Sequence, residues 1–530
     1  MDSNTGIQII ASKEPKPRQF EDALALTGFG KFNYLLLVVS GCVLVCVLME
    51  TLGMSFVVPS AQCDLELTTK QKGILSAIAF IGIISSSHLW GFLADTRGRR
   101  KVIMPTLLLA FFCTLASSFV NSVWLFILLR YFNGFFVSGG SATIYAYLGE
   151  FHNPRHRSRA IMGASSIFGF ACLALPTVAW LIINQKWSFY IDFLGYTYKP
   201  WRLYMVACGL PSLLCCFALW KLPESPKFLM NQGRNEEARQ IIAKMYRINT
   251  GKPESEFPVS SILDEYPGVD GENTNKTKKS FLRTVWDQTA PLFMGEHMKK
   301  TLIACTLQFG IFATSNGMYM WFPDIISKMT EFQNAHPGVP STICYVVQNS
   351  SMLRADDFID TTNSTTECKD TMEEQAFMHS LMLEAGYAIG FPIIGAIINS
   401  VGKLPILVFV MVSCGICGII CAFIEHLTIA SYLYLWLLVC GIAVTVVNAA
   451  LVDLYPTQLR AMAVCISLMM GRLGSVVGSN VVGIILDYNC DLTFLISGTS
   501  LIACGVIAFF IPNIYQKQVD RRTSIASYGP

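Results

Sequence analysis

The sequence predicts an all-α membrane protein of about twelve transmembrane helices, built as two related six-helix halves. Three observations predict this fold. Apolar residues make up 53% of the 530 residues and charged residues only 14%, the apolar residues gather in long spans, and one pattern of glycines and charges occurs in both halves. A water-soluble chain could not bury so many apolar side chains, whereas a bilayer solvates them directly.

The apolar spans are long enough to cross a membrane, which takes roughly 20 residues of helix. We expect them near residues 33–59, 73–94, 102–121, 123–148, 160–184, 201–221, 299–322, 376–399, 404–424, 429–452, 461–486 and 492–514. The first thirty residues are polar and hold no short apolar core with a cleavage site. The first span is therefore expected to direct insertion itself.

Basic residues predict the orientation, because retained cytoplasmic loops collect Lys and Arg. The loops after spans 2 and 4 carry Arg97, Arg99, Arg100, Lys101, Arg155, Arg157 and Arg159. The loop at 323–375 is acidic instead. We therefore divide the chain into a cytoplasmic segment 1–32, a bundle 33–222, a cytoplasmic linker 223–298, a bundle 299–515 with the external loop 323–375, and a cytoplasmic tail 516–530.

An internal repeat supports the two-bundle architecture. The stretch from Gly91 to Arg99, GFLADTRGR, recurs after span 8 as GAIINSVGK, from Gly395 to Lys403. A second pair follows spans 4 and 10. Glu150 precedes Arg157 by seven residues, as Asp453 precedes Arg460. Span 2 thus corresponds to span 8 and span 4 to span 10, as a duplication of six helices requires.

The stretch from Gly91 to Arg99 resembles the signature that follows the second helix of major facilitator proteins. Glycine permits a tight turn there, while the acid and the arginines are able to pair with charges on neighbouring helices. We expect a charge network that favours closure of the cytoplasmic side. The charged residues of this cytoplasmic gate are Asp95, Arg99, Glu150, Arg157 and Glu224, and its turn glycines are Gly91 and Gly98. The counterparts in the second half are Asn399, Gly402, Lys403, Asp453 and Arg460.

Further motifs resemble one branch of that superfamily. The segment ALALTGFGKF at 23–32 and the segment PESPKFL at 223–229 are similar to the sugar and organic-ion transporter group. The segment GRNEEA at 233–238 and the WFPD sequence from Trp321 to Asp324 resemble synaptic vesicle glycoprotein 2 and its relatives. The resemblance covers about residues 20–515 and implies two bundles around a central cavity that opens alternately to each side.

The chain also departs from these relatives. Synaptic vesicle glycoprotein 2 carries two acids three residues apart in its first helix, whereas this chain has Val47 at the first of these positions and keeps only Glu50. The sugar-porter signature after the last helix is missing, so a hexose substrate is disfavoured. Span 5 lacks the Gly-Pro pattern of proton-coupled drug exporters, which disfavours that activity as well.

Four charged residues lie well inside the spans, where a charge costs several kcal/mol unless it is paired or hydrated. They are Glu50, Arg130, Glu384 and Arg472, on spans 1, 4, 8 and 11. All four fall on helices that line the cavity in the major facilitator fold. Glu50 and Arg130 lie at matching depth and predict either an ion pair within the first bundle or contact with a charged substrate or proton. Glu384 and Arg472 are expected to form a similar arrangement in the second bundle.

Uncharged polar residues are weaker candidates for the cavity. These are Gln308, Asn316 and Tyr319 on span 7 and Asn448 on span 10, for which hydrogen bonding between helices is the simpler use. In the external loop, Asn349 and Asn363 begin glycosylation sequons. Cys344 and Cys368 share that loop, where oxidation is permitted, so a disulfide between them is one expectation and two separate thiols the other.

These features favour a transporter and disfavour an enzyme. No catalytic constellation, metal site or phosphate-binding glycine loop has supporting context, so we expect no cofactor, and the scattered basic residues predict no nucleic-acid partner. We expect a monomer in the plasma membrane or a vesicle membrane that moves a small, charged organic solute, with a coupled proton or ion as the energy source. The alternative is a transporter-like vesicle protein that acts in trafficking or protein interaction.

The predicted topology is testable with tags and glycosidases. Tags at either terminus should be protected inside intact cells, and Asn349 and Asn363 should carry glycans that a glycosidase removes, because both lie in the external loop. Protease protection and the mobility shift after deglycosylation measure this. A tag within 323–375 that stays protected, together with unmodified sequons, would overturn the orientation.

Overall fold

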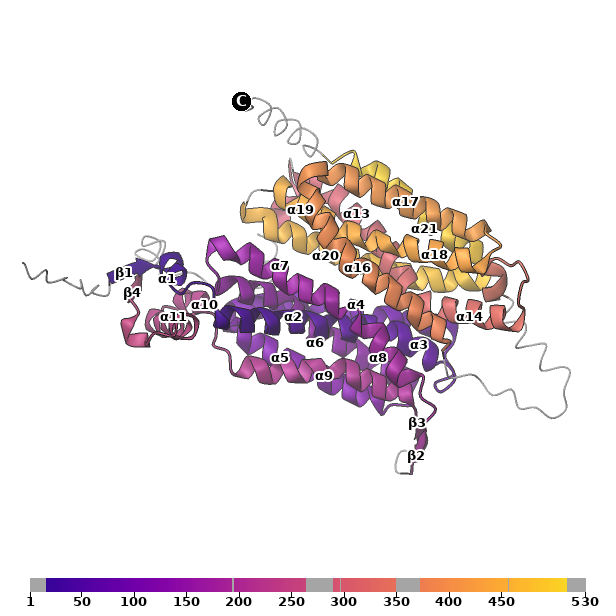
Figure 1. Cartoon of the computed structure of the whole chain (residues 1–530), viewed down its shortest axis with the longest axis horizontal. Helices are drawn as coiled ribbons and strands as arrows, with labels where there is room; N and C mark the ends of the chain where they lie inside the picture. The colour runs from indigo at the N-terminus through magenta and orange to yellow at the C-terminus, as the bar shows by residue number, and fades with distance from the viewer. Residues whose placement is uncertain are drawn as a thin grey trace, which may run out of the picture.

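A computed structural model describes residues 16–192, 195–263, 289–295, 297–348, 372–455 and 457–511. Within these ranges the chain folds into two bundles of long helices that lie side by side along the long axis of the molecule (Figure 1). The amino-terminal half forms one bundle and the carboxyl-terminal half the other, as the internal repeat predicts. Two bundles are also what the resemblance of the stretch from Gly91 to Arg99 implies.

The first bundle follows the predicted spans closely. Its helices are α2 (Lys31–Leu52) with its continuation α3 (Met54–Ser60), α4 (Thr69–Arg97), α5 (Arg99–Ser118), α6 (Val123–Glu150), α7 (Pro154–Ala171) with α8 (Ala174–Ile183), and α9 (Pro200–Trp220). Spans 1 and 5 are each interrupted once, after Leu52 and after Ala171. Helices α4 and α6 pack closely: a Cβ on Gly134 would overlap the Ala79 carbonyl oxygen, and glycine leaves that position empty.

The second bundle repeats this arrangement. Its helices are α13 (His297–Tyr319) with α14 (Phe322–Ala335), α16 (Glu374–Val401), α17 (Lys403–Phe423), α18 (Leu427–Leu438) with η3 (Val439–Ile442) and α19 (Ala443–Leu454), α20 (Thr457–Tyr488) and α21 (Cys490–Ala508). Among the described residues, eleven helices are long and apolar enough to cross a membrane by length and composition. Helix α13, which corresponds to the predicted span 299–322, is not among these eleven and packs against α19, α20 and α21 inside its bundle.

The two bundles meet along three pairs of segments. Helix α4 packs against α20, α16 packs against α7 and α8, and α3 packs against α14. These contacts join span 2 to span 11, span 5 to span 8, and span 1 to the extension of span 7.

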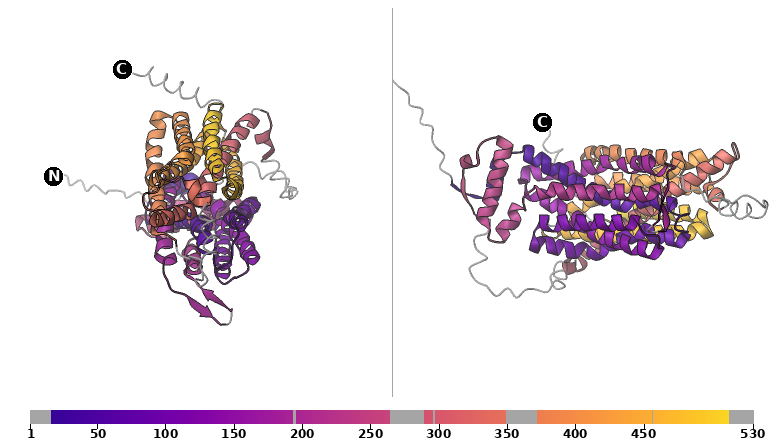
Figure 2. Two further views of the ribbon diagram at one scale, coloured as in Figure 1. Left: turned by 90° about the vertical axis from the view of Figure 1, so that its right-hand side faces the viewer. Right: turned by 90° about the horizontal axis from the view of Figure 1, so that it is seen from below.

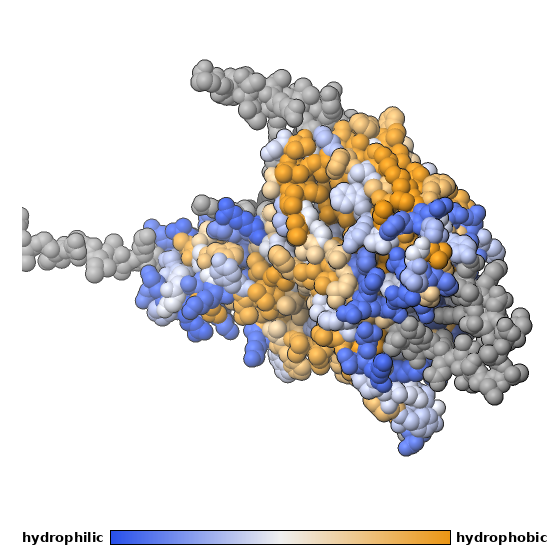
Figure 3. Space-filling model, turned by 45° about the vertical axis from the view of Figure 1, so that its right-hand side comes forward, coloured by the Kyte–Doolittle hydropathy of each residue, from blue (hydrophilic) through white to orange (hydrophobic). Residues whose placement is uncertain are grey.

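The two ends of the molecule differ in what they carry (Figures 1 and 2). The linker end holds α1 (Phe20–Leu26), α10 (Pro226–Asn231), α11 (Asn235–Thr250), η1 (Glu254–Glu256) and a parallel pair of strands, β1 (Lys16–Gln19) with β4 (Val259–Leu263). The opposite end holds α14 and the antiparallel hairpin β2 (Phe189–Ile191) and β3 (Tyr196–Tyr198). Hydrophobic residues dominate the surface between these two hydrophilic ends (Figure 3).

A disulfide joins Cys344 to Cys490 at the end that carries α14, so the expected bridge between Cys344 and Cys368 is wrong. Cys368 and the sequon residues Asn349 and Asn363 lie outside the described residues. Cys490 begins α21 and is 146 residues away in sequence, which explains why loop composition alone pointed to the wrong partner. Cys63, after α3, is disulfide-bonded as well. We call this end the disulfide end.

The Cys344–Cys490 bridge predicts a loss of stability when it is removed. Cys490→Ser should destabilise the folded protein by about 2–4 kcal/mol, because the bridge closes a long loop in the unfolded chain. Thermal unfolding of purified protein, with and without reductant, measures this, and Cys465→Ser is the matched control because Cys465 is an exposed free thiol. Non-reducing peptide mapping that finds Cys490 as a free thiol would contradict the assignment.

Candidate functional site

The repeated motif forms the same backbone turn in both halves. Gly98 ends α4 with φ 111° and ψ 148°, and Gly402 ends α16 with φ 99° and ψ 158°. Residues with a side chain rarely adopt this region, so glycine is required at both positions. The other expected turn glycine, Gly91, lies inside α4 with no heavy atom within 4 Å of a Cβ placed on it. Gly91 therefore plays no part in the turn, and the same holds for Gly395 inside α16.

At the linker end the expected charge network is present in part. Arg99 Nη2 lies 2.9 Å from Asp95 Oδ1 and 3.0 Å from Glu150 Oε1, so one guanidinium joins α5 to the ends of α4 and α6. Glu224 accepts hydrogen bonds from the backbone N–H groups of Arg100 and Lys101, at 3.0 and 3.3 Å, and thereby caps α5. All of these groups belong to the first bundle and its linker.

Arg157 differs from the expectation. Its Nη2 lies 2.9 Å from Glu21 Oε1 on α1, and its Nε donates to the Gly149 carbonyl, instead of pairing with Glu150. The amino-terminal segment thus contacts the start of α7, which sequence spacing did not reveal because Glu21 is 136 residues away. In the second half, Lys403 Nζ donates to the Ala449 carbonyl at 2.7 Å. The side chains of the counterparts Asn399, Asp453 and Arg460 are outside what the structure describes.

Glu50 and Arg130 form the ion pair expected within the first bundle. Arg130 Nη1 lies 3.4 Å from Glu50 Oε2, with 2% and 0% of the two side chains exposed, and Arg130 Nη2 also donates to the Glu50 backbone carbonyl. Thr114 Oγ1 donates to Glu50 Oε2 at 2.6 Å and Asn133 Nδ2 at 3.0 Å. These hydrogen bonds replace part of the water that both charges lose on burial, whereas Glu50 Oε1 and Arg130 Nε have no hydrogen-bond partner among the described residues.

The surroundings of this pair are entirely within the first bundle. Thr114 comes from α5, and Gly209 of α9 lies against the second carboxylate oxygen, where a Cβ would approach Glu50 Oε1 to 3.2 Å. Helices α5 and α9 are spans 3 and 6, which the fold places on the outside of the bundle. The pair therefore faces the centre of its own bundle, and none of its described partners comes from the second half.

Glu384 and Arg472 do not form the second ion pair that their positions suggested. Glu384 is buried on α16, accepts a hydrogen bond from Tyr319 Oη at 2.8 Å and is hydrogen-bonded to the thiol of Cys172, which lies between α7 and α8. Arg472 lies on α20, and its Nη1 donates to Ser87 Oγ of α4 at 3.2 Å. Each charge thus lies at the contact between the bundles, and each is bonded to neutral groups among the described residues.

The uncharged candidates bond within the second bundle. Gln308 Nε2 donates to Asn448 Oδ1 at 2.8 Å and joins α13 to α19. Asn316 Nδ2 donates to Ser475 Oγ at 3.0 Å and joins α13 to α20. These contacts are the interhelical hydrogen bonds that the sequence made the simpler use. Tyr319 differs, because its partner Glu384 lies beside the first bundle.

Sequence reasoning missed the residues that contact the charges from the other half. Ser87 and Cys172 are small residues on apolar helices, and such residues occur throughout this chain. Lys72 is buried in the first turn of α4, yet it lies one residue before the predicted span 73–94 and was therefore not among the charges counted inside the spans. A basic residue directly before an apolar span was the one available signal.

Two six-helix bundles with charged residues at their contact define a membrane transport protein of the major facilitator type. The chain belongs to the sugar (and other) transporter family, whose family model matches residues 40–355. A second family model, that of the Major Facilitator Superfamily, matches residues 372–526.

Curated relatives carry the name synaptic vesicle glycoprotein 2. The human protein 2B is 29% identical over 365 residues, which are 64% of this chain and 53% of that protein. The chain therefore matches about half the length of the human relative. The rat protein 2B aligns over 597 residues at 26% identity, covering 95% of this chain and 86% of that protein.

Solved structures share the fold at low sequence identity. A partially occluded, inward open structure of the xylose transporter XylE from E. coli has a TM-score of 0.62 at 15% identity and covers 91% of this chain and 100% of that chain. A bacterial homologue of the human lysosomal transporter Spinster, in an inward-facing conformation, has a TM-score of 0.61 at 12% identity and covers 92% and 99%.

The geometry of Glu50 and Arg130 predicts that the pair stabilises the folded protein. Comparison of the single mutants with the double mutant distinguishes this role from a role in transport. Glu50→Gln or Arg130→Gln alone should destabilise the protein by about 3–5 kcal/mol, because the remaining charge is buried without its partner. The double mutant should recover part of the melting temperature and of the surface abundance. A fully stable Glu50→Gln protein with altered uptake would show instead that Glu50 acts in transport.

Proposed function

We propose that this transporter moves a small organic solute with an anionic group through the space between the two bundles, by alternating access. The observation that carries the proposal is Arg472. Arg472 is half-buried at the contact between α20 and α4, and its guanidinium is hydrogen-bonded to the neutral Ser87. Among the described residues no acidic side chain pairs with it.

A charge in this position needs a reason, because an unpaired guanidinium inside a membrane costs several kcal/mol. Structural charges in this chain are paired, as Arg130 is with Glu50 and Arg202 with Asp64. A carboxylate, sulfate or phosphate on a solute would supply the partner that Arg472 lacks. Guanidinium suits such groups, since it donates two parallel hydrogen bonds.

Glu384 is the proposed site of a coupled proton. It lies between α13, α16 and the α7–α8 junction, so its surroundings change when the bundles separate. Protonation removes its charge, which lets a buried carboxyl group cross between two environments at lower cost. Proton coupling would then drive uptake of the anionic solute.

The orientation remains as proposed from the sequence. The linker end, with its basic loops, would face the cytoplasm, and the disulfide end would face the outside or a vesicle lumen. Disulfides persist in oxidising compartments, so Cys344–Cys490 supports this orientation independently of the charge rule.

A second candidate function is a trafficking or interaction role in vesicle membranes. The names of the curated relatives, synaptic vesicle glycoproteins, support it. A solute assay separates the two candidates.

Uptake into liposomes with substituted Arg472 tests the proposal. A panel of organic carboxylates and their neutral amide analogues should identify a solute that moves only as the anion. Arg472→Gln should lower its uptake about 10- to 100-fold, since a hydrogen bond to a charged group contributes about 1.5–3 kcal/mol. Arg472→Lys is the matched control, and it should retain more uptake because it keeps the positive charge.

Equal melting temperature and equal reconstitution must accompany these comparisons. Uptake of the anion that is the same in the parent and in Arg472→Gln would remove Arg472 from the site. Absence of uptake for every solute in the parent protein would favour the interaction role.

A further inference from the structure

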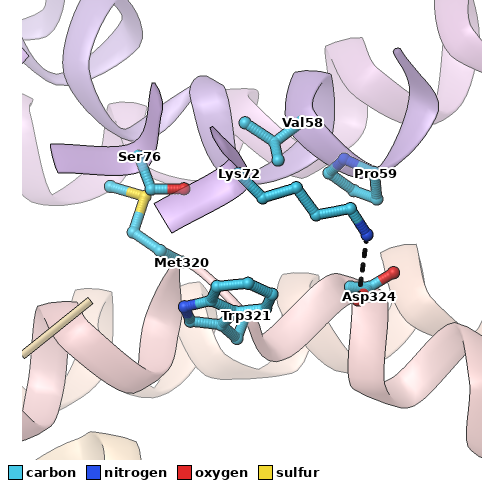
Figure 4. A pocket seen from close by; sticks show the side chains of 7 residues that line it. All are labelled: Val58, Pro59, Lys72, Ser76, Met320, Trp321 and Asp324. Atoms are coloured by element: carbon cyan, nitrogen blue, oxygen red, sulfur yellow. Dashed lines mark ion pairs between the residues drawn. The ribbon is translucent and has the colours of Figure 1, made fainter. Parts of the chain in front are cut away.

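An ion pair connects the two bundles at the disulfide end. Lys72 in the first turn of α4 and Asp324 in the first turn of α14 point toward each other from opposite sides of the contact (Figure 4). The distance from Lys72 Nζ to Asp324 Oδ2 is 3.8 Å, and only 6% and 11% of the two side chains are exposed. Asp324 ends the WFPD sequence, which the proposed solute site does not use.

Mostly apolar groups cover this pair and exclude water. Val58, Pro59 and Ser76 approach from the first bundle and Met320 and Trp321 from the second (Figure 4). The space between them leaves no room for a water molecule. Beside it, the rings of Phe56 on α3 and Phe377 on α16 stack at 5.8 Å with an angle of 7° between their planes. The disulfide end is therefore closed where the bundles meet.

Each member of the pair also has a partner in its own bundle. Lys72 Nζ donates to Gln62 Oε1 at 2.5 Å, and Asp324 Oδ2 lies 3.1 Å from Lys328 Nζ on the next turn of α14. Breaking a buried ion pair is costly when one charge is left alone. Here each charge keeps a polar partner after the bundles separate, so the pair is suited to open and close repeatedly.

The two charges are fixed to different rigid units. Trp321 Nε1 donates to the Ser479 carbonyl on α20 at 3.0 Å, and Tyr434 Oη donates to the Met318 carbonyl at 2.9 Å, so the base of α14 is held by the second bundle. Lys72 is part of the continuous helix α4 of the first bundle. Separation of the bundles at this end thus requires that Lys72 and Asp324 part.

We propose that Lys72 and Asp324 form the gate of the disulfide end, which holds the protein closed on that side until the bundles rotate apart. This inference rests on the alternating access proposed above. The pair of Arg202 with Asp64, at 2.8 Å, lies at the same end but within the first bundle, so it has no such role. Among the described ion pairs, Lys72–Asp324 is the one that joins the two bundles.

Cysteine accessibility tests the gate without any solute. Ser76 is buried beneath the pair, so Ser76→Cys reports opening of this end to a membrane-impermeant thiol reagent added from outside. Cys63, Cys344 and Cys490 are held in disulfides, and the parent without Ser76→Cys measures the background of the other thiols. Asp324→Asn should raise the labelling rate of the introduced thiol about tenfold, because closure loses its charged contact.

Matched variants make the result specific to the pair. Lys328→Met keeps Lys72–Asp324 and removes the partner that Asp324 retains after the bundles separate, so it should not raise the labelling rate. Asp324→Glu keeps the charge and should retain slow labelling. The double variant Lys72→Gln with Asp324→Asn should label no faster than the faster single variant, because both substitutions remove one interaction.

Unchanged labelling in Asp324→Asn, at parental melting temperature, would overturn the proposal. So would equal acceleration by Lys328→Met, or effects that add in the double variant, since both would indicate general loss of charge. Faster labelling in a protein that moves no solute would support the gate and reject the solute proposal, so the two failures are distinguishable.

Discussion

The cost of a charge in hydrocarbon is the constraint on which the rest of this structure depends. A buried ion is tolerated only where another ion or several hydrogen bonds replace water. Glu50 and Arg130 are paired within one bundle, and Thr114 and Asn133 add hydrogen bonds to one of the two carboxylate oxygens. They therefore belong to a unit that stays intact when the bundles move.

Glu384 and Arg472 meet the same demand differently. Their partners are a phenol, a thiol and a serine hydroxyl, and the last two come from the opposite bundle. Neutral partners offset less of the cost than an opposite charge does. Glu384 and Arg472 thus lack a charged partner among the described residues, whereas Glu50 and Arg130 have each other. The sequence alone did not distinguish these two pairs of residues.

The contact between the bundles is uneven along its length. At the disulfide end, Lys72–Asp324 and the stacked rings of Phe56 and Phe377 join the halves directly. At the linker end, the described ion pairs of Arg99 and Arg157 lie within the first bundle and its amino-terminal segment. Among the described residues, charged contacts across the halves therefore lie at the disulfide end, and those at the linker end stay within the first bundle and its amino-terminal segment.

The sequence by itself determined the number of spans, their positions within a few residues, the two-bundle repeat and the turns at Gly98 and Gly402. These follow from hydropathy, helix rise and backbone sterics, which are local properties. It also identified the four charges inside the spans, because their cost depends on depth alone. Only the tertiary structure decided which residues are partners. The pairs are Arg157 with Glu21, Cys344 with Cys490, Arg472 with Ser87 and Lys72 with Asp324. Each of these contacts joins residues far apart in the chain. The packing of whole bundles decides which helix faces lie opposite one another, and a local sequence pattern holds no information about that packing.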